Sequence, residues 1–375
     1  MENVVVKIGG SLLRNGKDYI NVAQNIKNTL IEKDLRPIVV VSASKGVTDL
    51  LLQVARGLRD SLKEVEIRYM DIAHELGSVK LVRRIEEEIS RLRRIAENIE
   101  VLDQALVDYI LSYGERISKI IMVQALEIQG INAFELNATD IIITNSVHGD
   151  ATIDYPATAV ALEKIYGIIK DRKYVPVIEG FIGRSSEGEI TTIGRGGSDY
   201  TATTIAALLK LDRVYLVTDV DGIMTTDPDV VPTARLVKYM SYREALEASM
   251  YGAKGINPKA FDPLEKVYSS RVVIGSWKHF GTTISKEIPE EYYGPKVIML
   301  KDMVDYSYIA IIGEGVSRAV FLRDTLDTIV RLGVEIKGIQ TYVHRPSTVL
   351  YVDRNQGREI LKMLHKALFE EGSAI

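Results

Sequence analysis

Short β-branched runs alternate with amphipathic stretches along the first 218 residues. Five buried strands are predicted, over residues 3–8, 37–43, 131–136, 174–179 and 213–218. Five helices are predicted between and after them, over residues 17–34, 47–61, 115–128, 157–171 and 198–210. Alternating strands and helices are typical of a mostly parallel sheet sandwiched by helices. The pattern therefore predicts an α/β fold, whose ligands bind beyond the carboxyl ends of the strands.

Two parts of the chain depart from this rhythm. Residues 60–110 are strongly charged, with apolar residues at helical spacing, which predicts a helical hairpin inserted beside the cleft. Pro289, Gly294 and Pro295 interrupt the pattern before a short C-terminal part. We therefore expect a large domain over residues 1–288 and a small α+β domain over residues 296–375.

The small domain shows its own order of elements. Its strands are predicted over residues 296–300, 306–313, 334–343 and 347–353, and its helices over residues 317–332 and 355–370. This order predicts a small sandwich with helices on one face of the sheet.

Composition narrows the chemistry. The chain has no cysteine, which excludes disulfides, thiolate nucleophiles and Cys-ligated metals, and its five histidines lack metal-ligand spacing. A net charge of -4 offers no electrostatic reason to expect nucleic acid or an anionic membrane. Since no apolar run is long enough to span a bilayer and the N-terminus lacks a signal-peptide pattern, we expect a cytoplasmic protein.

The opening of the chain carries the first candidate site. A β-branched strand ends at Lys7 and is followed by Gly9, Gly10 and Ser11. A strand, a tight glycine turn and a helix N-terminus present backbone N–H groups to an anion, and a lysine adds a mobile positive charge. The motif indicates phosphoryl transfer, although a plain glycine turn after a strand is the alternative.

Two further clusters could hold charged groups. Ser42, Ser44 and Thr48 follow the second strand and can bind a carboxylate or phosphate, or simply cap the next helix. Glu115 follows Gly114 and can bind an ammonium group, or complement a helix dipole.

The densest cluster is Gly194-Arg195-Gly196-Gly197-Ser198-Asp199. Arg195 lies among three glycines, so its planar fork can reach a carboxylate with little bulk nearby. Asp199 follows four residues later, and a cation and an anion at this spacing match the two charged ends of an amino acid. The alternative is a glycine loop followed by a capped helix.

A last cluster follows the fifth strand. Thr218 and Asp219 can hold ribose hydroxyls or magnesium, and Lys254 in a later glycine turn can contact phosphates. A plain turn with a solvated lysine is the alternative. The chain has no P-loop, G-x-G-x-x-G, H-E-x-x-H or G-x-S-x-G motif, so a nucleotide site here belongs to another kinase architecture.

Taken in order, these clusters resemble the aspartate kinases of the amino acid kinase family. The resemblance covers residues 3–285 and rests on six ordered motifs, which run from the Lys7 turn to Ser241-Tyr242-Arg243-Glu244-Ala245. It implies phosphorylation of the β-carboxylate of L-aspartate by Mg-ATP, with ATP and Mg²⁺ as cofactors and no protein metal site. A carboxylate is already ionised at pH 7, so positioning and charge neutralisation are sufficient for catalysis.

The resemblance also implies roles for single residues. Catalysis would involve Lys7, Gly9, Gly10, Ser11 and Asp199. L-Aspartate would be held by Ser42, Thr48, Glu115, Arg195 and Asp199. The nucleotide would contact Lys7, Gly10, Thr218, Asp219 and Lys254.

Some positions depart from the family pattern. Met224 and Asp229 stand where relatives usually carry Tyr and Arg, beside the nucleotide. Residues 308–353 resemble a single ACT regulatory unit, which would pair protomers into a homodimer or higher homo-oligomer. A kinase of the same fold acting on another amino acid, and a catalytically silent amino-acid-binding subunit, remain the alternatives.

Overall fold

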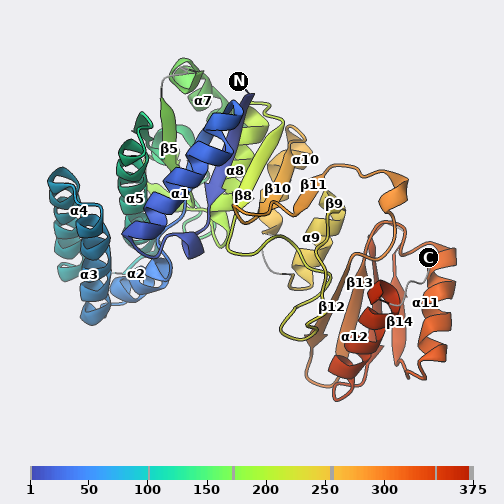
Figure 1. Ribbon diagram of the computed structural model, residues 1–375. Coiled ribbons are helices and arrows are strands. Elements are labelled where there is room, and N and C mark those ends of the chain that lie inside the picture. The colour runs from blue at the N-terminus through green and yellow to red at the C-terminus, as the bar shows by residue number, and fades with distance from the viewer. Residues whose placement is uncertain (1, 100–101, 171–173, 254–256, 343, 371–375) are drawn as a thin grey trace. The chain divides into compact units, whose positions relative to one another are not determined.

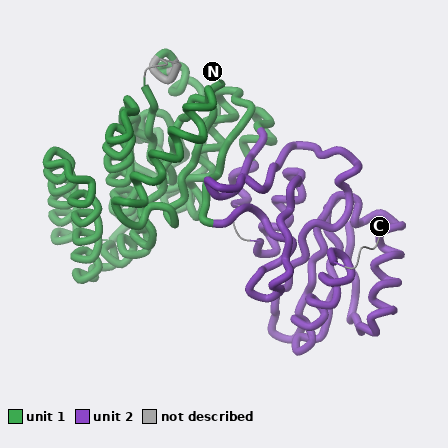
Figure 2. Tube along the Cα trace, viewed as in Figure 1, with its two compact units in different colours: residues 1–219, 262–270 green, residues 220–261, 271–375 purple. Residues whose placement is uncertain are grey.

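The structure is a computed structural model that describes the whole chain except residues 1, 100–101, 171–173, 254–256, 343 and 371–375 (Figure 1). Contacts divide it into two compact units (Figure 2). Unit 1 comprises Met1–Asp219 and Asp262–Ser270, and unit 2 comprises Val220–Phe261 and Arg271–Ile375. Among the described helices, none is long and apolar enough to cross a membrane.

Unit 1 contains a five-stranded parallel sheet. Its strands lie in the order β3 (Ala133–Leu136), β5 (Val175–Glu179), β2 (Leu35–Val41), β1 (Glu2–Ile8) and β8 (Arg213–Val217). All four pairings are parallel. Val4, Val5 and Val6 of the central strand are fully buried, as expected for a sheet covered on both faces.

Helices cover this sheet and confirm the predicted α/β class. Helix α5 (Gln104–Ile128) packs on β2, β3 and β5 and contacts α1 (Gly16–Thr29) and α2 (Val47–Ala55). Helix α8 (Gly197–Leu208) packs on β1, β2 and β8 and contacts α7 (Tyr155–Lys170) and α10 (Asp262–Lys266).

The charged segment after α2 forms a helical hairpin, as predicted. It consists of α3 (Arg59–Glu75) and α4 (Val79–Glu97), which lie side by side (Figure 1). The apolar face of α4 buries Leu81, Ile85 and Leu92. A small sheet of β4 (Ile143–Thr144), β6 (Ile182–Ser185) and β7 (Ile190–Thr192) completes the strands of unit 1 and was not predicted. A short helix, α6 (Ala138–Ile141), precedes β4.

Unit 2 contains two sheets. One consists of β10 (Arg271–Gly275), β11 (Thr282–Ser285) and β9 (Tyr239–Ser241), which leads into α9 (Tyr242–Met250). The other is antiparallel, in the order β12 (Val297–Asp302), β13 (Ser307–Ile312), β15 (Ser347–Val352) and β14 (Gly338–Thr341).

Two helices bury their apolar faces against the antiparallel sheet. Phe321 and Ile329 of α11 (Ala319–Arg331) and Ile360 and Leu364 of α12 (Gly357–His365) share one core cluster with the strands. The small α+β domain is therefore present as predicted.

The spatial division of the chain differs from the predicted domain boundary. Residues 220–261 belong to unit 2 because they pack on the small domain: Val231 enters its core, and the Thr225 carbonyl accepts a 2.7 Å hydrogen bond from the Ile298 amide. The Thr225 hydroxyl also lies 2.9 Å from Nε2 of the buried His365. A functional boundary between residues 288 and 296 remains a prediction.

Candidate functional site

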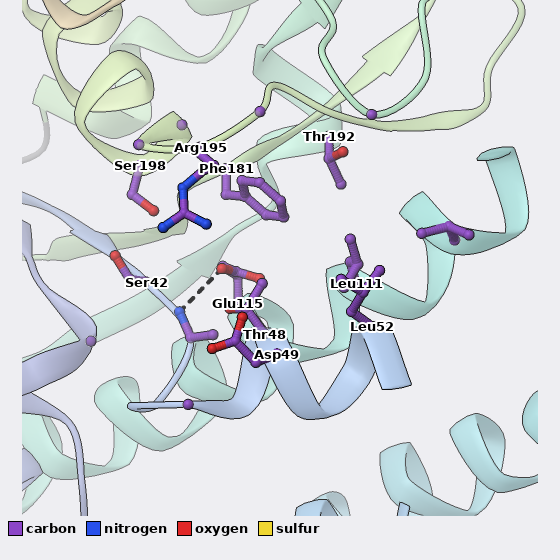
Figure 3. Close-up of a pocket in the computed structure, with 18 of the residues that line it drawn as sticks. Ser42, Thr48, Asp49, Leu52, Leu111, Glu115, Phe181, Thr192, Arg195 and Ser198 are labelled. Carbon is purple, nitrogen blue, oxygen red and sulfur yellow. Dashed lines mark hydrogen bonds between the residues drawn. The ribbon is translucent and has the colours of Figure 1, made fainter. Parts of the chain in front are cut away.

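The candidate active site is a pocket of about 670 Å³ within unit 1, at the carboxyl ends of β1 and β2 (Figure 3). It brings together eight of the residues singled out from the sequence, namely Lys7, Gly10, Ser11, Ser42, Thr48, Glu115, Arg195 and Asp199. They come from two strand ends, the first turn of α2, the middle of α5 and the loop that opens α8. This convergence at one edge of a parallel sheet is where the topology places ligands.

Lys7 and Asp199 form the charged pair on the strand side of the pocket. Lys7 is one residue from the end of β1, and its Nζ lies 2.7 Å from Oδ1 of Asp199 in the first turn of α8. Their side chains are 16% and 13% exposed. The ammonium therefore lies at the pocket and is paired with a carboxylate.

The glycine turn after Lys7 brings the backbone of Gly9 and Gly10 close to the backbone of Val217 and Ala43. The Gly9 amide donates to the Val217 carbonyl at 3.1 Å, and residues 10–12 form a single 3-10 turn. A Cβ at Gly10 would lie 2.5 Å from the Ala43 carbonyl oxygen. Any larger residue at position 10 must displace this backbone, so glycine is required there for close approach.

Glu115 is a buried acid facing the pocket from α5. Its side chain is 3% exposed, Oε1 accepts a hydrogen bond from the Ala43 amide at 3.2 Å, and Oε2 has no hydrogen-bond partner among the described residues. Burial, assisted by the nearby charge of Glu179, raises the pKa of Glu115 to about 8. A buried carboxylate oxygen without a partner favours a cationic ligand.

A second buried acid near it is ion-paired. Glu179 lies at the end of β5, and its carboxylate is 3.0 Å from Nζ of Lys119, which also donates to Asn137 Oδ1 at 2.6 Å. Both side chains of the ion pair are almost fully buried. Of these two acids, only Glu179 has a cationic side chain as its ion-pair partner among the described residues.

Arg195 projects from the loop that precedes α8. Gly194 and Gly196 on either side adopt positive φ angles of 78° and 72°, which side chains other than glycine rarely adopt. Figure 3 shows the guanidinium directed into the pocket from the side opposite Glu115, with Ser42 and Ser198 near it. The pocket therefore presents a cation and an acid to one small ligand.

Two buried tyrosines support the pocket floor and were missed from the sequence. The Tyr19 hydroxyl lies 2.9 Å from Oγ of Ser44 and donates to Ser118 at 2.9 Å; burial raises its pKa to about 12. The Tyr69 hydroxyl donates to the Gly114 carbonyl at 2.7 Å. The Tyr19 hydroxyl joins the loop after β2 to α5, and the Tyr69 hydroxyl joins α3 to α5. No sequence pattern distinguishes such tyrosines from other aromatic residues of the core.

One wall of the pocket is apolar and was also missed. Phe181, which has a positive φ of 68°, faces Leu52 and Leu111 across the cavity (Figure 3). A signal was available, because Phe181 follows the end of β5 at the same sheet edge. This wall excludes water from one side of the charged groups, which strengthens their electrostatic interactions.

Two predicted nucleotide contacts, Thr218 and Asp219, do not line this pocket. Thr218 and Asp219 follow β8, which neighbours β1 in the sheet, and the Thr218 hydroxyl donates to Asp219 at 3.1 Å. Lys254 lies outside the described residues. Gly9 is buried in the turn beneath the pocket.

Among the described residues, no group of three or more His, Cys, Asp or Glu side chains could hold a metal ion. A magnesium ion bound mainly through phosphate oxygens and waters needs only one or two protein ligands.

Comparisons with known proteins show which family the chain is similar to. The sequence matches the model of the Amino acid kinase family over residues 2–276. It is 34% identical to the lysine-sensitive aspartokinase 3 of Escherichia coli over 278 residues, which covers 70% of this chain and 59% of that protein. It is 29% identical to aspartokinase 2, chloroplastic, of Arabidopsis thaliana, covering 96% of this chain and 69% of that protein.

A solved structure shows the same overall similarity. E. coli aspartokinase III in complex with aspartate and ADP superposes with a TM-score of 0.74 at 27% identity, covering 98% of this chain and 84% of that chain. The chain spans about 59% of the length of its E. coli relative in the sequence comparison.

Proposed function

The chain belongs to the amino acid kinase family, and from that premise we propose that it is an aspartate kinase. The proposed reaction is attack of the β-carboxylate of L-aspartate on the γ-phosphorus of ATP, which gives 4-phospho-L-aspartate and ADP. The observation that carries this proposal is the placement of Arg195, Glu115 and Lys7 around one small cavity. Arg195 and Glu115 complement the carboxylate and the ammonium group of an α-amino acid, and Lys7 complements a phosphate.

Each side chain takes a separate part in this proposal. Arg195 binds a carboxylate of aspartate through its planar fork. Glu115 accepts the α-ammonium through its unpaired Oε2, with Asp199 as a second acid near the same group. Ser42 and Thr48 hold carboxylate oxygens through their hydroxyls. The attacking carboxylate is thereby held in line with the phosphate.

Lys7 provides the charge that the transition state requires. In the free site its ammonium is paired with Asp199 at 2.7 Å. When the γ-phosphate is bound, the same ammonium bridges the phosphate and the acceptor carboxylate, and the amides of Gly9, Gly10 and Ser11 surround the transferred group. Positioning and charge neutralisation then supply most of the catalysis.

ATP is proposed to enter as its magnesium complex. The metal neutralises charge on the phosphate oxygens when bound, and the acidic Asp219 is the described residue from the predicted nucleotide set that suits it. Thr218 and Lys254 are proposed as further contacts of the nucleotide.

The test is a coupled assay of ATP consumption by the purified chain with a panel of amino acids. We expect turnover with L-aspartate, trapping of the acyl phosphate by hydroxylamine, and at least about a tenfold lower kcat/KM for L-glutamate because of its extra methylene. Turnover with another amino acid, but not with aspartate, would assign a different acceptor. No turnover with any of them would indicate a silent binding subunit.

The C-terminal domain is proposed to be an ACT-like unit that pairs protomers through its sheet. The edge strand β14 exposes Ile339, which is 41% accessible, and the neighbouring Tyr342 is 51% accessible. An unpaired sheet edge with apolar side chains favours pairing with a second copy. Light scattering should show a dimer that Ile339→Lys dissociates; a dimer unchanged by this substitution would refute pairing through β14.

A further inference from the structure

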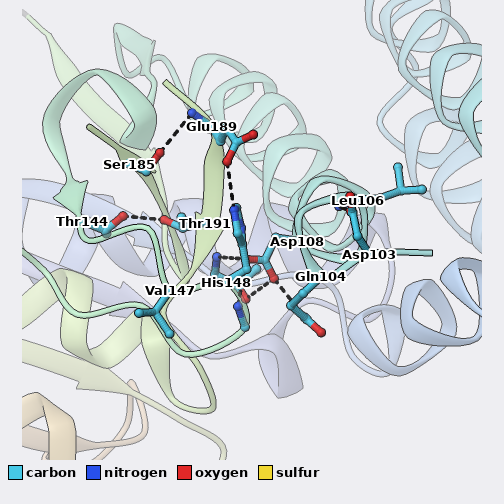
Figure 4. A network of polar contacts seen from close by, with 12 residues as sticks. Asp103, Gln104, Leu106, Asp108, Thr144, Val147, His148, Ser185, Glu189 and Thr191 are labelled. Atoms are coloured by element: carbon cyan, nitrogen blue, oxygen red, sulfur yellow. Dashed lines mark hydrogen bonds and ion pairs between the residues drawn. The ribbon is translucent and has the colours of Figure 1, made fainter. Parts of the chain in front are cut away.

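Asp108 is a buried acid on α5 that has no role in the proposed reaction. Its side chain is 0% exposed, and its carboxylate accepts hydrogen bonds from several groups at once (Figure 4). Oδ2 accepts from the Gly149 amide and the Thr192 amide, both at 2.9 Å, and lies 3.1 Å from Nδ1 of His148. Oδ1 accepts from Oγ1 of Thr192 at 2.7 Å and from Nε2 of Gln104 at 3.4 Å. A buried carboxylate that accepts this many hydrogen bonds holds its donor groups in fixed positions.

His148 closes this network on its outer side. Its Nε2 lies 3.1 Å from Glu189, an exposed acid at 51% accessibility, so the ring bridges two carboxylates. Partial burial lowers the pKa of His148, but its hydrogen bonds to Glu189 and Asp108 outweigh this and raise the pKa overall. A protonated imidazole supplies the positive charge that a wholly buried carboxylate needs.

The position of Asp108 connects the two halves of the amino-acid pocket. It precedes Glu115 by seven residues on α5, which is about two turns and ~10 Å along the same side of the helix. Thr192 ends β7 and precedes Arg195 by only three residues. The carboxylate therefore joins the helix that carries the proposed ammonium ligand to the strand that leads into the proposed carboxylate ligand.

The residues that Asp108 holds are themselves part of the pocket wall. Gly149, Thr192 and Gln104 all line the cavity. Any shift of β7 away from α5 would move this wall and lengthen the distance between the charges of Arg195 and Glu115. Geometric precision of this kind depends on hydrogen bonds behind the residues that touch the ligand.

We propose that Asp108 and His148 are positioning residues that set the spacing between Arg195 and Glu115 and thereby the selectivity for aspartate. The inference rests on the proposed function, because it assigns those two groups to the ends of the amino acid. Asp108 touches neither substrate and acts through Thr192 and Gly149.

A purely structural role makes a different prediction. An acid that only stabilises the fold would, when removed, lower the amount of active protein and leave the KM values unchanged, since KM does not depend on the concentration of active enzyme. A positioning residue changes the KM for aspartate and the ratio of kcat/KM between aspartate and glutamate. These two quantities therefore separate the two roles.

The experiment uses the full chain and begins with substitutions of Asp108 and Thr192. Asp108→Asn turns a carboxylate oxygen into an amide that faces N–H donors, which leaves at least one buried donor unpaired. Thr192→Val removes one hydrogen bond while keeping the shape of the side chain. The matched control is Thr191→Val, whose hydroxyl lies 2.6 Å from that of Thr144 on the other face of the same strand.

We expect Asp108→Asn to raise the aspartate KM at least about tenfold and to reduce the preference for aspartate over glutamate, while the KM for ATP stays within about twofold. Thr192→Val should change the same quantities less, and Thr191→Val should leave them at the wild-type values. His148→Asn keeps a donor toward Asp108 and should retain more aspartate affinity than His148→Ala.

The outcomes separate this inference from the proposed function. A wild-type chain that consumes no ATP with aspartate overturns both. An active wild type whose aspartate KM and acceptor preference survive Asp108→Asn overturns the positioning role alone. If Asp108→Asn does not fold, Thr192→Val decides by the same comparison, and a result equal to that of Thr191→Val overturns the inference.

Discussion

The sharpest prediction concerns the pH dependence of aspartate binding. Burial raises the pKa of Glu115 to about 8, so in the free enzyme at neutral pH this side chain is mainly protonated. An α-ammonium group is bound well only by the ionised carboxylate. Binding of aspartate must therefore expel the proton from Glu115, and affinity should increase as the pH rises toward 8.

The size of the effect follows from that pKa. With binding restricted to the ionised form, the apparent KM is multiplied by one plus the ratio of protonated to ionised enzyme. The factor is about 100 at pH 6, about 11 at pH 7 and about 2 at pH 8. At pH 7 the same model gives about 0.9 proton released for each aspartate bound.

The assay is a set of KM values for aspartate between pH 6 and pH 8 at constant ionic strength and saturating ATP. Proton release is measured separately by titration calorimetry in two buffers that differ in ionisation enthalpy. An aspartate KM that changes less than about threefold over this range, without proton release, would refute the assignment of Glu115 as the ammonium ligand.

Glu115→Gln is the control because it keeps the shape of the side chain and cannot ionise. We expect a weakened aspartate KM that no longer changes steeply with pH. A steep dependence that survives in this variant would come from another group, such as His148.

Stability provides an independent check on the same carboxyl group. Its pKa is higher in the folded state than in the unfolded chain, so the stability it contributes is present at low pH and is lost as the pH rises from about 4.5 to about 8. The melting temperature of Glu115→Gln should therefore exceed that of the wild type increasingly across this interval.

Three further substitutions test the site and its support. Lys7→Ala should lower kcat at least about a hundredfold, the cost of one transition-state donor, while circular dichroism shows an unchanged fold; near-normal turnover would remove the catalytic role. Lys119→Met should destabilise the fold by about 3–5 kcal/mol in urea unfolding, since Glu179 is left as an uncompensated buried charge; a loss below about 1 kcal/mol would contradict this. Gly10→Ala should abolish most activity because the added Cβ would lie 2.5 Å from a carbonyl oxygen, and wild-type kinetics would show that the turn can adjust.

Strands β1, β2, β5 and β8 could be predicted because each is rich in valine and other apolar residues. Helix boundaries were harder to predict near glycines, because a glycine can either end a helix or lie inside one. The helix predicted over 47–61 begins at residue 47 as expected but is too long, since α2 ends at Ala55 and Gly57 adopts a left-handed φ of 86° before α3 begins. Conversely, α5 begins at Gln104, well before the predicted residue 115. Gly114 lies inside this helix for packing, because a Cβ there would be 2.8 Å from that of Ala43.

The Lys7 and Ser42 motifs could be predicted because each lies at the carboxyl end of a strand, and those ends meet at the same edge of the sheet. Glu115, in the middle of α5, and Arg195 could be predicted only from their residue types and the neighbouring glycines. The residues behind the pocket could not. Asp108 lies in a helix with no motif around it, and its partners Gly149 and Thr192 are 41 and 84 residues away. The sheet that contains β7 is too short to produce a periodic signal. Such residues acquire their role only from tertiary contacts.

The buried acids around the pocket differ in how they are satisfied, and this difference favours one of them as the ligand-binding group. Asp108 has a full set of donors, and Glu179 has Lys119. In Glu115, Oε1 accepts a hydrogen bond from one backbone amide, whereas Oε2 has no hydrogen-bond partner among the described residues. Burying a carboxylate in this way costs stability unless a cation completes it. A fold that gives Asp108 several donors and Glu179 a lysine, and leaves Oε2 of Glu115 open toward a pocket that also presents Arg195, is arranged for a ligand that carries both charges.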